Sequence, residues 1–279
     1  MKDPGAAGLP AAGSSSRLAA LPTLAVLVAL AGLEGLLRLP PLPPAPAAFA
    51  GERSAQKAVE RHADIRSDSL EIDLQLDRHG DFVLFHDETL DGRPIGSYAA
   101  GELTGKVESL EAFVAGLERD GLRLAYLHLD LKPRPVLPGR MARTFARARP
   151  LLDRLSKSCG SLVLSSPAPA AYADAHRFVV ASGLAGRGVW PVLDLIDFDA
   201  ADAARWRLPM TVLERAVLPA ARAANNLYFR LLRGRLAYLT VTERTAASWT
   251  GPDRLICWSR ETAPGPLPER CLKTERELR

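Results

Sequence analysis

The sequence predicts an α/β protein, a (β/α)8 TIM barrel preceded by an N-terminal hydrophobic helix. Beyond residue 50, short apolar runs alternate with longer segments that carry apolar residues at helical spacing. Such alternation is typical of parallel strands joined by crossover helices. About seven or eight strands in roughly 230 residues fit one closed barrel. The first 50 residues differ in composition and contain one long apolar run, which predicts the hydrophobic helix.

Strands are expected where apolar residues cluster in short runs, and helices where they recur every three or four positions. The expected strands are 70–76, 82–85, 122–131, 161–165, 188–195, 236–241 and 255–258. The expected helices are 52–62, 110–117, 139–157 and 212–232.

Residues 18–37 are almost unbroken Ala, Leu and Val, and the run matches the roughly 20 residues needed to cross a bilayer. An uncleaved signal anchor is the favoured interpretation. A cleaved signal peptide is an alternative, because Ala48-Phe49-Ala50 has a small-x-small pattern. A buried core helix is a third, and Glu34 within the run supports it. We expect a cytoplasmic N-terminus and an exported domain, periplasmic or extracellular, which would be secreted if the segment is cleaved.

The chain therefore divides into five expected segments. They are an N-terminal tail at 1–17, a signal anchor or signal peptide at 18–38, a Pro/Ala-rich linker at 39–50, the barrel at 51–260 and a charged C-terminal tail at 261–279. The linker should be an extended polyproline spacer that holds the barrel off the membrane.

Composition argues against a nucleic-acid partner. The net charge is +4 over 279 residues, and few aromatic residues lie among the scattered basic ones. A nucleic-acid interface would show a denser basic patch with aromatic residues between. The three cysteines form no Cys-x-x-Cys pair, so no zinc site is expected.

Acidic and basic side chains gather on two of the expected strands. Glu71 and Asp73 stand two apart, so the alternation of a strand points both carboxylates to the same side. Asp130 and Lys132 share one face of a second strand. The three carboxylates are hard oxygen ligands suited to Mg²⁺ or Ca²⁺, and Lys132 could pair with a phosphate. His86 follows another expected strand and completes a candidate metal-assisted acid/base site.

Each of these residues also has a plainer interpretation. Glu71 and Asp73 could form the solvent face of a half-buried strand. His86 with the following acid could be a capped turn. His128 fits a packing or ligand-supporting role better than that of a ligand, and His79 lies in a polar turn that we expect to be exposed.

Two motifs at a characteristic spacing resemble the glycerophosphodiester phosphodiesterase family. Glu-Ile-Asp at 71–73 is followed, after a turn and an apolar run, by Phe-His-Asp-Glu-Thr-Leu-Asp at 85–91. The segment 107–113 is also similar to the family's Pro-Thr-Leu-Glu-Glu segment, and the resemblance covers about residues 50–135. It implies a TIM barrel, a metal bound by Glu71 and Asp73, and His86 as one of two acid/base histidines.

The expected strand at 122–131 and the lysine that follows it carry the resemblance further. Asp130 stands where the family's Ile-Glu-x-Lys strand has Glu, so it is a shortened metal ligand, and Lys132 matches the Lys. The family's opening His-Arg-Gly is missing, because the comparable place reads Ala-Phe-Ala-Gly-Glu-Arg at 48–53. One catalytic histidine is therefore expected to be absent.

The resemblance implies a metal-dependent phosphodiester hydrolase that acts on glycerophosphodiesters or related lipid headgroups. His86 would be the general acid or base and Lys132 would hold the phosphate. Losing one of two acid/base groups would leave a weak or inactive enzyme. The alternative is a barrel that binds phosphodiesters or lipids without turnover. A lyase mechanism that yields a cyclic phosphate is a third hypothesis.

Overall fold

The structure, a computed structural model, describes about half of the sequence. The described residues are 39, 56–57, 69–133, 135, 138–194, 218–220, 222–223, 238–242, 254–259 and 271–276. The segments 1–17 and 18–38, most of the linker and the expected helix at 212–232 except five of its residues lie outside this set. No helix among the described residues is long and apolar enough to span a membrane.

A 10-stranded sheet organises the described part of the chain. All its strands except β3 and β6 run parallel to their neighbours. In spatial order the parallel strands are β1 (Gln56–Lys57), β2 (Ser69–Leu76), β7 (Leu124–Leu131), β8 (Cys159–Ser166), β9 (Val189–Asp194), β10 (Tyr238–Thr242), β11 (Arg254–Ser259) and β12 (Cys271–Arg276). The predicted α/β fold with a parallel sheet is therefore confirmed. β1 and β12, the first and last of these strands, also contact each other.

An antiparallel excursion follows β2 before the chain returns to the parallel sheet. β3 (Phe82–Leu84) pairs with β2, and β6 (Glu108–Ser109) pairs with β3. Between them lie the hairpin of β4 (Thr89–Leu90) and β5 (Arg93–Pro94), the 3-10 turn η2 (Ile95–Ser97) and the short helix α2 (Ala100–Leu103). Their buried side chains pack on Val83 and form a small core of their own, made by Val83, Ile95, Tyr98 and Leu103.

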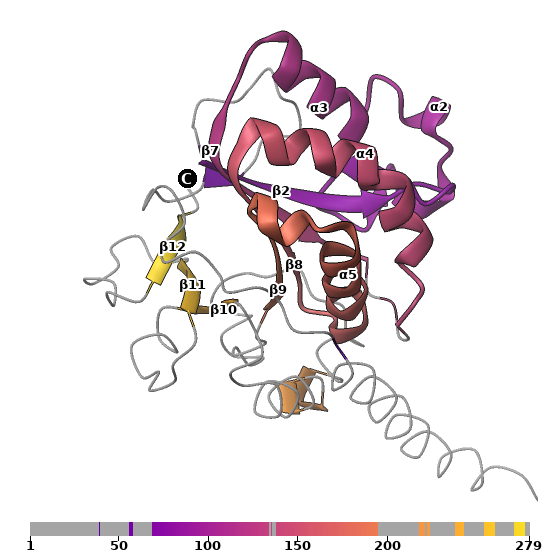
Figure 1. Cartoon of the computed structure of the whole chain (residues 1–279). Helices are drawn as coiled ribbons and strands as arrows, with labels where there is room; N and C mark the ends of the chain where they lie inside the picture. Colours follow the sequence, from indigo (N-terminus) through magenta and orange to yellow (C-terminus); the bar gives the residue numbers. More distant parts are fainter. Residues whose placement is uncertain are drawn as a thin grey trace, which may run out of the picture.

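Three helices cover one side of strands β2, β7, β8 and β9 (Figure 1). They are α3 (Leu110–Arg119), α4 (Ala142–Ser158) and α5 (Pro169–Ser182), and the 3-10 turn η3 (Leu184–Arg187) follows α5. Leu residues on alternate positions of the strands pack against them. On β2 and β7 these are Leu70, Leu74, Leu127, Leu129 and Leu131, all buried in the main core. Period-2 alternation therefore sends the apolar half of each strand toward the helices.

The ends of the helices have identifiable local causes. Ser109 precedes α3, and its hydroxyl accepts the Ala112 N–H, which satisfies one of the free donors of the first turn. Gly183 ends α5 with φ at 71°, a left-handed conformation that a glycine adopts at little cost. The start of α4 is capped from α5, because the Asp174 carboxylate accepts the N–H groups of Gly139 and Met141.

Most expected elements are confirmed, but two segments differ. Residues 56–57 form strand β1, so the helix expected at 52–62 is wrong at this point. Helical propensity is a weak preference, and pairing of Gln56 and Lys57 with β2 overrides it. Within the charged tail expected at 261–279, Cys271–Arg276 forms β12 and pairs with β11. Its polar sequence lacks the alternation that would have indicated a strand.

Candidate metal centre

Three carboxylates meet on the side of the sheet that faces away from the helices. Glu71 and Asp73 come from β2, and Asp130 comes from β7, where it is the register partner of Asp73. Register partners on parallel strands point to the same side, so the backbone pairing alone brings these side chains together. One oxygen from each of the three lies within 4.8 Å of the others. Glu71 is buried, and the other two are half-buried.

The cluster sits at the carboxyl ends of the neighbouring strands. Asp130 is the penultimate residue of β7, and its partner Ser165 is the penultimate residue of β8. β2 runs on beyond Asp73 and turns back into β3, whose continuation at Phe85 donates its N–H to the Asp73 carbonyl at 3.0 Å. The hairpin therefore fixes the backbone of Asp73 from the side opposite β7.

Lys132 lies between two of the carboxylates. Its Nζ is 2.7 Å from Asp73 Oδ1 and 2.5 Å from Asp130 Oδ2. Burial lowers the pKa of the Lys132 ammonium, but the carboxylates of Asp130 and Asp73 outweigh it, so the pKa is raised above its usual value. The amine therefore stays protonated and provides a fixed positive charge within the cluster.

The donor set fits a divalent cation. Three carboxylates face a single ammonium, so with these groups ionised the cluster carries excess negative charge that a divalent cation would balance. Carboxylate oxygens are the ligands that Mg²⁺ and Ca²⁺ prefer. The residues present therefore suit the Mg²⁺ or Ca²⁺ that the sequence predicts at Glu71, Asp73 and Asp130.

A buried histidine and serine adjoin the cluster. His128 is the register partner of Glu71, and its Nε2 lies 2.5 Å from Ser165 Oγ. The Ser165 hydroxyl in turn lies 3.5 Å from Asp130 Oδ1 and donates to it. His128 thus lies on the same side of the sheet as the carboxylates. Ser165 is a site residue that the sequence patterns did not single out; the available signal was its place at the end of the strand expected at 161–165.

His86 pairs with its neighbour Asp87 rather than with the three carboxylates. It follows β3, its side chain is 37% exposed, and its Nδ1 is 2.8 Å from Asp87 Oδ1. Among the described residues, the hydrogen bond that His86 makes is thus to its neighbour and not to the carboxylates. The loop itself is anchored to β2, because Gln75 Nε2 donates to the Asp87 carbonyl at 3.1 Å. The structure brings together the three acids and Lys132, and holds His86 half-buried, one residue after the Phe85 N–H that bonds to Asp73.

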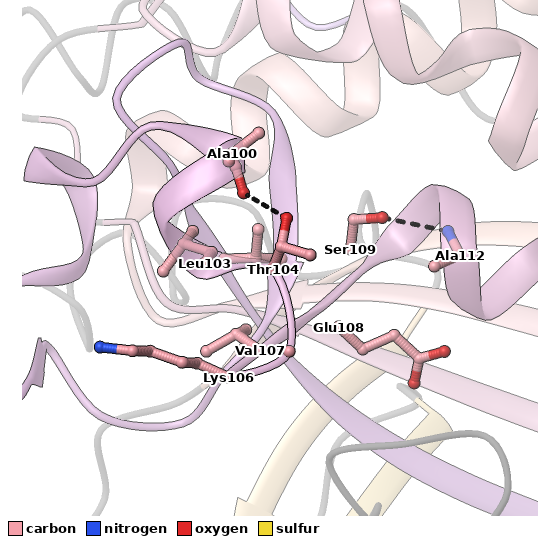
Figure 2. Close-up of a pocket in the computed structure, with 11 residues that line it drawn as sticks. Ala100, Leu103, Thr104, Lys106, Val107, Glu108, Ser109 and Ala112 are labelled. Atoms are coloured by element: carbon pink, nitrogen blue, oxygen red, sulfur yellow. Dashed lines mark hydrogen bonds between the residues drawn. The ribbon is translucent and has the colours of Figure 1, made fainter.

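A separate pocket of about 580 Å³ opens beside the antiparallel segment that runs from β3 to β6 (Figure 2). Its walls come from β3, α2, β6 and the first turn of α3, and they include Val83, Leu103 and Val107. Figure 2 shows the Ser109–Ala112 and Thr104–Ala100 hydrogen bonds on its two sides. None of the three carboxylates lines it, so it is distinct from the metal centre.

Comparison with known proteins adds a structural likeness. No family model matches the sequence, and no curated protein matches it. A glycerophosphodiester phosphodiesterase from Parabacteroides distasonis aligns over 80% of this chain and 92% of its own, at 12% identity and a TM-score of 0.48. One from Thermotoga maritima covers 80% and 93%, at 12% identity and 0.42. One from Agrobacterium tumefaciens covers 75% and 87%, at 14% identity and 0.39. The chain is similar in structure to several members of the family that its motifs resemble.

Proposed function

We propose that the protein is a metal-dependent phosphodiester hydrolase acting on glycerophosphodiesters or related lipid headgroups. The observation that carries the proposal is the convergence of Glu71, Asp73 and Asp130, with Lys132 between two of them. Three oxygen ligands for a divalent cation lie beside an ammonium group. Together the cation and the ammonium would balance the negative charge of a bound phosphodiester. The same combination has little use in a site for a neutral ligand.

We infer that the sheet closes into a (β/α)8 barrel. Leaving out β3 and β6, the 10-stranded sheet consists of eight parallel strands, and contact between β1 and β12 would complete the circle. Helices cover one side of β2, β7, β8 and β9, while the other side holds buried polar residues such as His128 and Ser165. The cluster at the carboxyl ends of β7 and β8 is where barrel enzymes place their sites.

Each residue of the centre has a role in this mechanism. A divalent cation bound there supplies Lewis-acid polarisation of the phosphoryl oxygens. Glu71, Asp73 and Asp130 would hold it, and Lys132, while paired with the two aspartates, would also donate to a phosphate oxygen. His86 donates a proton to the leaving alkoxide or takes one from the attacking water. General acid–base assistance of this kind is worth about 10²–10⁴-fold.

A second function is a barrel that binds phosphodiesters without turnover. Two observations favour it. The sequence has no His-Arg-Gly ahead of the Glu-x-Asp pair, and His86 is hydrogen-bonded to Asp87 at the surface. Under this alternative the metal and Lys132 still bind the phosphate, but no group delivers the proton. A third function is cleavage through a cyclic phosphate, which the products would reveal.

Turnover with defined controls separates these functions. The full chain is incubated with glycerophosphocholine and with a lysophospholipid, with Mg²⁺, Ca²⁺ or chelator, and products are followed by phosphorus NMR. Metal-dependent release of a phosphomonoester, lost in Asp73→Ala, supports the hydrolase, and a cyclic product supports the lyase. His86→Ala should abolish turnover and spare metal binding. His79→Ala, which removes an exposed histidine in the β2–β3 turn, is the matched control. Binding of the diester without any product would establish the binding protein.

We propose further that residues 18–38 anchor the protein in a membrane and that residues 51–260 form the exported barrel. The apolar run at 18–37, whose length suits a bilayer, supports this arrangement. The lipid-derived substrate would then lie near the same membrane, and no nucleic-acid partner is implied. The full chain should stay in the membrane pellet after alkaline extraction, and deletion of 18–37 should release it. Release of a shortened chain would argue for a cleaved signal peptide, and release of the full-length chain would argue against a membrane anchor.

A further inference from the structure

We propose that Ser165 and His128 are positioning residues that orient the Asp130 carboxylate for metal binding. The proposal rests on the metal centre of the proposed function and adds two residues to it. Neither is a ligand in this arrangement. Ser165 touches Asp130, and His128 acts on Asp130 through Ser165.

The register of three strands places these groups in two adjacent layers. Asp73, Asp130 and Ser165 are partners across β2, β7 and β8, and Glu71 and His128 are partners in the layer below. The His128 side chain therefore extends toward the carboxyl ends of the strands and across to the neighbouring strand β8, where it meets Ser165. Both are buried, with exposures of 4% for His128 and 0% for Ser165, so water does not compete for their hydrogen bonds.

The donors and acceptors of this chain have one consistent order. A serine hydroxyl has a single proton, and the carboxylate of Asp130 can only accept. Once the Ser165 proton points to Asp130 Oδ1, the oxygen of Ser165 is free to accept from His128 Nε2–H at 2.5 Å. An N–H that donates to a hydroxyl makes that hydroxyl a better donor, so each bond strengthens the next.

Asp130 is thereby held at both oxygens. Lys132 pairs with Oδ2 at 2.5 Å and Ser165 donates to Oδ1 at 3.5 Å, so rotation of the carboxylate about its bond to Cβ is opposed strongly on one side and more weakly on the other. A carboxylate that is already oriented loses less freedom when a cation binds. Partners that orient metal ligands typically change metal affinity by about 10–100-fold when they are removed.

Direct measurement of Mn²⁺ binding to the full chain tests the proposal without reference to activity. Ser165→Ala should weaken Mn²⁺ binding by about tenfold. Ser161→Ala is the matched control, because Ser161 is buried on the same side of the same strand, at the level of Tyr126 and below the cluster. It should leave the affinity unchanged. Both variants are compared by thermal unfolding in chelator, which shows whether either change acts through folding.

His128 supplies a second, independent pair of variants. His128→Gln keeps an N–H that can reach Ser165 and should retain most of the Mn²⁺ affinity. His128→Met fills similar space without a donor and should weaken binding as Ser165→Ala does. Because the two residues act as one unit, the double variant of Ser165→Ala with His128→Met should bind Mn²⁺ no more weakly than either single variant.

The outcomes distinguish this inference from the proposed function. If the unmodified protein binds no Mn²⁺, the metal centre itself is wrong. If it binds Mn²⁺ and neither Ser165→Ala nor His128→Met changes the affinity, only the positioning role is overturned. Equal weakening by His128→Gln and His128→Met would show that the hydrogen bond is not the cause and would also overturn it. Should Ser165→Ala fail to fold, the two His128 variants decide.

Discussion

At the scale of single residues, Lys132 is the group on which the stability of the carboxylate cluster depends. It provides the positive charge between Asp73 and Asp130, and its side chain is only 21% exposed. Lys132→Met leaves the carboxylates facing one another without a counter-ion. Removal of one partner from a buried ion pair costs about 3–5 kcal/mol, and we expect the low end because the pair is not fully buried. Thermal unfolding in chelator measures the loss.

The same variant should respond strongly to metal. A divalent cation supplies the missing charge, so Mg²⁺ or Mn²⁺ should recover much of the stability that Lys132→Met loses. Lys157→Met, which removes an exposed lysine near the end of α4, is the control and should change stability by less than about 0.5 kcal/mol. Equal melting temperatures of Lys132→Met with and without metal would contradict the shared role of lysine and cation.

Cys159 offers a residue-scale test of burial. Burial raises the pKa of its thiol to about 12. Only the thiolate reacts with iodoacetamide, so near pH 8 about one thiol in 10⁴ is reactive. We expect peptide mapping to find Cys159 almost unmodified in the native protein and fully modified in denaturant. Because the pKa lies far above the working range, raising the pH from 8 to 9 should speed the native reaction about tenfold. Rapid native labelling would show that β8 opens at its start.

At the scale of elements, the packing of β8 on β7 requires a glycine. A Cβ at Gly160 would lie 2.8 Å from the Ala125 carbonyl oxygen of the neighbouring strand, a contact with backbone that cannot move freely. Gly160→Ala should therefore destabilise the protein by about 1–3 kcal/mol, the usual cost of overpacking. Gly186→Ala in η3 is the control, because a Cβ there meets nothing within 4 Å. Urea unfolding of both variants measures the difference.

The start of α4 depends on a residue of another helix. The buried carboxylate of Asp174 accepts the Gly139 and Met141 N–H groups at 2.6 Å and 2.9 Å. Asp174→Asn removes the charge and one acceptor, so a buried N–H loses its partner, and a cost of about 2–3 kcal/mol is expected. Asp153→Asn breaks only the exposed contact with Arg187 and should cost less than about 1 kcal/mol. Similar losses in chemical denaturation would contradict the capping role.

At the scale of the whole molecule, the sequence predicts most of the sheet because period-2 alternation survives in single strands. The runs at 70–76 and 122–131 show it, and their register brings Asp73 and Asp130 together. What the sequence does not show is contact between distant segments. The strand at 56–57 acquires its place from pairing with β2, and no local pattern marks it. Ser165 lies at the end of an expected strand, but its position beside Asp130 comes from the pairing of β8 with β7. The hydrogen bond of His86 to Asp87 likewise depends on the course of the loop after β3.

Convergence of β2 and β7 at the cluster also links metal binding to the stability of the whole fold. A cation that binds the native state and not the unfolded chain stabilises it by about 2.7 kcal/mol at 100 times its dissociation constant. Mg²⁺ or Mn²⁺ should therefore raise the melting temperature of the full chain relative to chelator, in proportion to the logarithm of its concentration. Asp73→Asn should abolish this shift, because it replaces one of the three anionic ligands with a neutral, weaker oxygen donor. Asp81→Asn is the control, since Asp81 forms an exposed contact with Arg147 in the β2–β3 turn. A shift that persists in Asp73→Asn would place the cation elsewhere.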